Sequence, residues 1–114
     1  MPAARELGGR LRRPLGIVQA VTAVAHFVAG HYAEAAEWAA KAHREHPSFL
    51  GAIRNMAASN ALCGQLEHAQ KALDRARELD PDLRISNLKD RIGPYRPDDF
   101  ARFAEGMRLA GLPE

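Results

Sequence analysis

The chain has 114 residues, of which 46% are hydrophobic and 26% charged, a balance that suits one small folded domain and excludes a disordered chain. Residues 1–14 hold four arginines and one glutamate, a net charge of +3. Because the whole chain carries +2, the other 100 residues carry a net −1. Because no basic face is expected on the folded part, we do not expect nucleic-acid binding. The single cysteine excludes an internal disulfide.

The N-terminal segment, residues 1–14, is predicted to be a flexible basic tail without the features of a signal peptide. An apolar stretch follows from Leu15 to Ala29, and it is interrupted by Gln19, Thr22 and His26. This stretch is too short and too polar to span a bilayer. We therefore expect a cytoplasmic protein with no membrane partner.

The residue types predict an all-α protein. Alanine occurs 22 times, whereas valine, isoleucine and threonine together occur nine times, and strong helix formers dominate the rest of the chain. No segment alternates apolar and polar residues for long enough to form a strand, and no Asn-Gly or Asp-Gly hairpin turn occurs.

An internal repeat, with a period of about 34 residues, runs through the middle of the chain. The period separates Gly30 from Gly64, and it also separates the pairs Ala35 and Ala69, Ala42 and Ala76, and Pro47 and Pro81. Each unit predicts a helix that ends at glycine, a turn, and a second helix that proline stops. Small residues at three- and four-residue spacing on the second helix allow the two helices to approach closely.

After Pro81 the period breaks. We expect Asp80 to cap a short helix that runs from Pro81 or Asp82 to about Arg91, followed by a loop with two prolines. A last helix is predicted to begin near Pro97 and to end at Gly111. Its apolar stripe comprises Phe100, Phe103, Met107 and Ala110. We interpret residues 84–114 as a diverged cap on the two repeats.

With this period and these landmarks the chain resembles tetratricopeptide (TPR) repeat proteins. The resemblance implies a right-handed α-solenoid in residues 15–114, with repeats at 16–49 and 50–83. The second half of each unit matches the family pattern well, whereas the first helix of each unit departs from it. There the family's Trp, Leu-Gly and Tyr are replaced by Gln19, Thr22-Ala23 and His26 in one repeat, and by Ile53, Met56-Ala57 and Asn60 in the other.

The C-terminal part is also similar to the TPR tails of bacterial multidomain regulators, among them class III adenylate/guanylate cyclase-like proteins and winged-helix regulators. The similar segments are 85–91, 96–99 and 106–114. This resemblance implies a regulatory TPR segment without cyclase activity, because the chain has no mixed αβ domain with two metal-binding aspartates.

The TPR resemblance implies a non-catalytic protein-interaction module, with a concave apolar groove that binds a peptide or helix of a partner protein and needs no cofactor. Asn55 matches one position of the family's carboxylate clamp and Arg54 lies beside it, but the rest of the clamp is missing. The family's groove positions fall on Ile17, Ala20, Val24, Phe27, Val28, Gly51, Arg54, Asn55, Ala58, Ala61 and Leu62.

Self-association is the alternative to a separate partner. The helix expected in residues 15–29 is apolar nearly all round, and a helix of this kind is normally buried all round. Its own hairpin and the next repeat cover only part of it, so we expect a homodimer through this first helix. The chain would then be the regulatory fragment of a cyclase-like or transcriptional regulator. An enzyme subunit that binds a small ligand is the weakest alternative.

A metal site is not expected. His43 and His46 lie three residues apart near a helix end, where they could share an ion with His68 or Cys63. The simpler interpretation is that polar or cationic side chains at a helix C-terminus favour the helix dipole, and that Cys63 is a structural thiol. The sequence contains no phosphate-binding loop and no nucleophile or zinc-protease motif.

Overall fold

The computed structural model describes the backbone of residues 2–114 and the side chains of residues 15–114. No strand occurs in the described backbone, so the all-α prediction is confirmed. The predicted flexible tail, residues 1–14, lies outside the described side chains and stays a prediction. The helices are α1 (Pro2–Val28), α2 (Tyr32–Glu45), α3 (Leu50–Leu62), α4 (Leu66–Leu79), α5 (Ile85–Arg91) and α6 (Pro97–Ala110).

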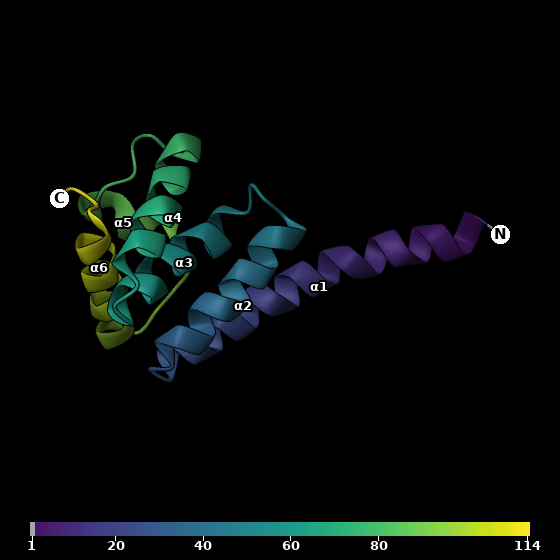
Figure 1. The fold of residues 1–114 in the computed structure, drawn as a ribbon, viewed down its shortest axis with the longest axis horizontal. Helices are drawn as coiled ribbons and strands as arrows, with labels where there is room; N and C mark the ends of the chain where they lie inside the picture. The colour runs from purple at the N-terminus through teal and green to yellow at the C-terminus, as the bar shows by residue number, and fades with distance from the viewer. Residues whose placement is uncertain (1) are drawn as a thin grey trace.

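The helices pack as two hairpins with α6 added (Figure 1). Helix α2 lies along the C-terminal part of α1, and α3 packs against both α2 and α4. Helix α6 packs mainly against α3 and more lightly against α4 and α5. The molecule is elongated, with principal extents of 53 × 29 × 26 Å.

The period of the sequence recurs in the backbone. Helix α4 begins and ends one full period after α2, and α3 ends one period after α1. The turns repeat as well, because Gly30 has φ 83° and Gly64 has φ 87°, the left-handed region that glycine adopts without a Cβ penalty. The N–H of His31 donates to the carbonyl of His26 at 2.8 Å, and the N–H of Gln65 donates to the carbonyl of Asn60 at 2.8 Å. Both turns are therefore the same C-terminal capping motif.

Alanines of the repeat are buried on the second helix of each hairpin. Ala35 and Ala42 on α2 and their counterparts Ala69 and Ala76 on α4 are fully buried. This burial is what we expect of small residues that let neighbouring helices approach closely.

The start of α5 differs from the prediction. Helix α5 begins at Ile85, and Asp80 is the C-terminal capping residue of α4 instead of the N-cap of α5. The carboxylate of Asp80 accepts a hydrogen bond from Nε of Arg91 at 3.1 Å. Oδ1 of Asn87 accepts one from the N–H of Arg84 at 2.8 Å and so satisfies a free donor where α5 begins. The prediction that Asp80 caps this helix was wrong, because the acceptor at the start of α5 is the side chain of Asn87, the third residue of the helix.

Helix α6 begins at Pro97 and ends at Gly111, whose φ is 110°, as predicted. Phe103, Met107 and Ala110 of its apolar stripe are buried, and Phe100 is partly buried against the core. A Cβ added at Gly106 would lie 2.7 Å from the carbonyl oxygen of Ala58 in α3. The glycine therefore permits a close crossing of α6 over α3.

Candidate functional site

An apolar groove of about 340 Å³ lies between α1, the beginning of α3 and the loop that joins α5 to α6. We call it the α1 groove. Its walls come from segments that are far apart in the sequence, and tertiary packing alone brings them together. The lining residues are Ile17, Ala20, Val21, Val24, Phe49, Gly51, Arg54, Ile92, Gly93, Pro94, Tyr95 and Phe103.

Among the side chains that the structure describes, Arg54 is the only charged one that lines the α1 groove. Its Nε is buried and has no hydrogen-bond partner, and among residues 15–114 the guanidinium forms no ion pair. Burial lowers the pKa of Arg54 below its ordinary value, and the negative charge of Asp80 opposes this shift. The Asp80 carboxylate, however, is paired with Nε of Arg91 at 3.1 Å. A half-buried cation with an unpartnered Nε therefore faces a groove lined mostly by apolar side chains.

Tyr95 supplies a second polar group to the α1 groove. Burial raises the pKa of the Tyr95 phenol, Asp99 raises it further, and Arg54 partly opposes the shift. The ring packs against Phe27 and Phe103, with centroid distances of 6.2 and 5.6 Å. The phenol is therefore a hydrogen-bonding group at the edge of an aromatic cluster.

The α1 groove brings together part of the predicted interaction surface. Ile17, Ala20, Val24 and Arg54 line it, as does Gly51. Val28 is exposed on α1 but lies outside the lining, and Leu62 is partly buried against the core.

Several of the predicted groove residues belong to the core instead. Phe27 and Ala58 are fully buried, and Asn55 is 2% exposed and accepts a hydrogen bond from Oγ of Ser59 at 2.6 Å. Ala61 is buried as well. Their assignment to an open groove was wrong, because α6 covers this face of α3 and its Phe103 contacts Phe27.

The predicted interaction surface did not include the part of the α1 groove that lies outside the repeats. Ile92, Pro94 and Tyr95 come from the loop before α6, and Phe103 comes from α6 itself. The amphipathic stripe of α6 was visible in the sequence, but the stripe does not identify the helix that it contacts.

The exposed apolar side chains are concentrated on α1. Eight large hydrophobic residues are exposed among the described side chains, and only Leu66 and Leu109 lie elsewhere. The other six, which we call the α1 apolar face, are Leu15, Ile17, Val18, Val21, Val24 and Val28. This face continues from the wall of the α1 groove around the helix, so the expectation that the first helix is incompletely covered is confirmed.

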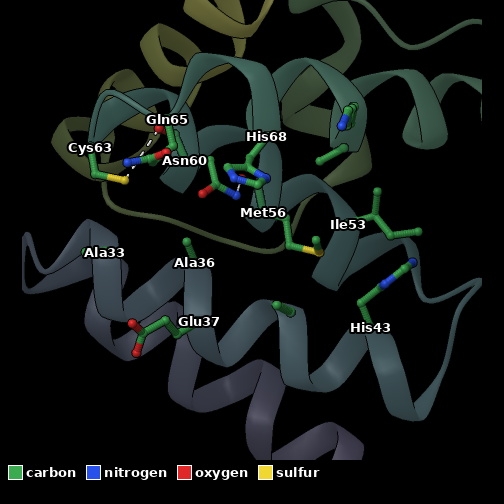
Figure 2. Close-up of a pocket in the computed structure, with 13 residues that line it drawn as sticks. Ala33, Ala36, Glu37, His43, Ile53, Met56, Asn60, Cys63, Gln65 and His68 are labelled. Atoms are coloured by element: carbon green, nitrogen blue, oxygen red, sulfur yellow. Dashed lines mark hydrogen bonds between the residues drawn. The ribbon is translucent and has the colours of Figure 1, made fainter.

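A larger groove of about 680 Å³ lies over α3 between α2 and α4 (Figure 2). Charged and polar side chains line much of it, among them Glu37, Lys71 and Gln65. Asn60, one of its polar residues, is satisfied locally, because its Nδ2 donates to the carbonyl of Met56 at 2.9 Å. None of the side chains that line this groove carries a buried polar atom without a partner. The α1 groove is therefore the stronger candidate site.

The structure does not bring together the residues considered as metal ligands in the second half of the first repeat and the second repeat. His43, Cys63 and His68 all line the larger groove, but Figure 2 shows His43 and Cys63 at opposite ends of it. Cys63 Sγ contacts the carbonyl of Asn60 at 3.5 Å. Among the described side chains, none of these residues belongs to a group of three ligands close enough to share an ion.

No protein-family model matches this chain, and no match was found among curated proteins or solved structures. Among the described residues, no helix combines the length and the apolarity needed to cross a membrane.

Proposed function

We propose that the chain is a non-catalytic, cytoplasmic protein-interaction module that binds a short helix or peptide of a partner protein in the α1 groove. The observation that carries the proposal is Arg54, a half-buried cation that finds no ion-pair partner among residues 15–114 and lies in a groove lined mostly by apolar side chains. A partner segment with large apolar side chains and one carboxylate would fill the groove and satisfy the guanidinium. The recurrence of helix ends and turns at the period of the sequence supports the accompanying proposal that the hairpins are TPR repeats in a right-handed solenoid.

The binding proposal predicts that a random peptide library displayed on phage, selected against the immobilised chain, yields peptides with apolar residues and an acidic residue. A synthetic copy of a selected peptide should bind the Arg54→Gln variant about 10–100-fold more weakly, because a charge-assisted hydrogen bond is lost. Fluorescence polarisation of the labelled peptide measures the affinity. The matched control is Lys71→Gln, which removes a cation from the larger groove and should leave the affinity unchanged. Equal binding to the parent and to Arg54→Gln would contradict the proposal.

Self-association is the second candidate function, and the α1 apolar face is the observation that favours it. Val18 and Val28 belong to this face, with exposed fractions of 57% and 42%, but they do not line the α1 groove. A second copy of the chain could bury this face by two-fold pairing, which is the simplest closed arrangement. In this case the chain would act as a self-associating regulatory segment of a cyclase-like or transcriptional regulator.

Light scattering coupled to size exclusion tests this alternative. At micromolar concentration we expect the parent to show twice the chain mass of 12.5 kDa. Val18→Glu and Val28→Glu should show the mass of a single chain, because a charge cannot be buried unpaired. Leu109→Glu is the matched control, since Leu109 is an exposed apolar residue of α6, and it should remain dimeric. A parent chain that elutes as a monomer would exclude a dimer through α1.

A further inference from the structure

The turn between α1 and α2 gathers three side chains that bind transition metals. His26 lies in the last turn of α1, His31 is the N-cap residue of α2, and Glu34 lies in its first turn. One ligand atom from each residue lies within 4.8 Å of the other two. Nδ1 of His31 is already 3.6 Å from Oε2 of Glu34, and the two imidazole rings are 5.8 Å apart between centroids.

The distances suit a first-row divalent ion after small side-chain rotations. A tetrahedral ion with ligands at about 2.0–2.1 Å holds its ligand atoms roughly 3.3 Å apart. The His31–Glu34 pair, at 3.6 Å, is close to this separation. The His26 ligand atom lies within 4.8 Å of the other two, so it must approach them by at most about 1.5 Å. Two imidazoles and one carboxylate suit zinc, cobalt or nickel better than calcium or magnesium, which prefer oxygen ligands.

The backbone and the core hold the turn that carries these ligands. The N–H of His31 donates to the carbonyl of His26 at 2.8 Å, so the two histidines are joined directly through the capping motif. Each is followed by an aromatic residue, and these residues, Phe27 and Tyr32, pack edge to face at 5.2 Å, with Phe27 fully buried. His31 makes no side-chain capping hydrogen bond, so its ring is available to a ligand. The turn is fixed before an ion arrives, which lowers the entropic cost of binding.

The second hairpin has the same turn without these ligands. The positions one period after His26, His31 and Glu34 are occupied by Asn60, Gln65 and His68. The hydrogen bond from the N–H of Gln65 to the carbonyl of Asn60 is also 2.8 Å long. The difference between the two turns therefore lies in the side chains and not in the backbone.

We propose that His26, His31 and Glu34 form a binding site for one divalent transition-metal ion, with zinc as the natural occupant. The three side chains leave at least one coordination position for water or for a donor from another molecule. The bound ion clamps the end of α1 to the beginning of α2. This site is separate from the α1 groove, whose lining on α1 ends at Val24.

Titration of the 114-residue chain with Co²⁺ and Zn²⁺ tests the proposal. We expect visible absorption bands from one Co²⁺ per chain, displacement of Co²⁺ by Zn²⁺, and a rise in melting temperature with added Zn²⁺. His26→Asn and His31→Gln place the residues of the second turn in the first, and Glu34→Gln removes the carboxylate. Each variant should bind Zn²⁺ at least about tenfold more weakly, since loss of even an outer-shell contact has an effect of this size.

Two controls make the result specific. His43→Gln and His46→Gln, which remove histidines outside the cluster, should bind as the parent does. The reciprocal variant carries Asn60→His, Gln65→His, His68→Glu and Cys63→Ala on the His31→Gln background, and it should regain one Co²⁺ per chain in the second turn. Far-ultraviolet circular dichroism verifies that each variant is folded. Failure of the parent to bind, one ion per two chains, or binding that His43→Gln abolishes would overturn the proposal.

Discussion

Replacement of Phe27 by alanine is expected to lower the free energy of unfolding by about 3–5 kcal/mol. The Phe27 ring is fully buried and contacts Tyr32, Tyr95 and Phe103, with centroid distances of 5.2, 6.2 and 5.3 Å. These contacts join α1 to α2, to the loop before α6 and to α6. Truncation would leave a cavity at the point where these parts of the chain meet, and the loss would be a large fraction of the stability of a small domain.

Urea denaturation followed by circular dichroism measures this loss. Val21→Ala on the same helix is the matched control, because Val21 is 62% exposed and its truncation should change stability by no more than about 0.5 kcal/mol. A loss below about 1 kcal/mol in Phe27→Ala would show that the aromatic cluster does not hold α6 against α1.

Gly106→Ala is expected to destabilise the fold by about 1–3 kcal/mol, although alanine favours a helix by about 1 kcal/mol over glycine. The added Cβ would lie 2.7 Å from the carbonyl oxygen and 3.0 Å from the Cα of Ala58. Both atoms belong to the backbone of α3, so relief requires the two helices to separate. Packing should therefore outweigh helix propensity and reverse the sign of the effect.

Thermal and urea unfolding of the variant check this sign. Gly93→Ala provides the matched control, since a Cβ there meets no atom within 4 Å, and we expect a change within about 0.5 kcal/mol. If Gly106→Ala were instead more stable than the parent, α6 would not cross α3 as closely as the structure places it.

Local signals in the sequence predicted most of the helices. Gly30 and Gly64, one period apart, marked the two turns, and both glycines adopt positive φ. The alanines of the repeat are buried where the helices meet. These features depend on residues within a few positions of one another, so the rules for capping, helix propensity and periodicity are sufficient to predict them.

The α1 groove was only half predictable. Ile17, Ala20 and Val24 share one face of a single helix, and their spacing shows this directly. The opposite wall depends on where α6 docks, and Phe27, Asn55 and Ala58 are buried because it docks on α3. The amphipathic stripe of α6 shows that one of its faces must be buried without showing against which helix.

The sequence by itself determined that the protein is all-helical, where the repeated helices and turns lie, and that the first helix is too apolar for its own hairpin to cover. The tertiary structure decided which residues remain accessible, because burial of a side chain depends on chain segments that are distant in the sequence. It also decided that His26, His31 and Glu34 meet, since their ligand atoms converge only when the turn after Val28 reverses the chain. Spacing predicts a shared face within one helix, but contacts between elements follow from packing.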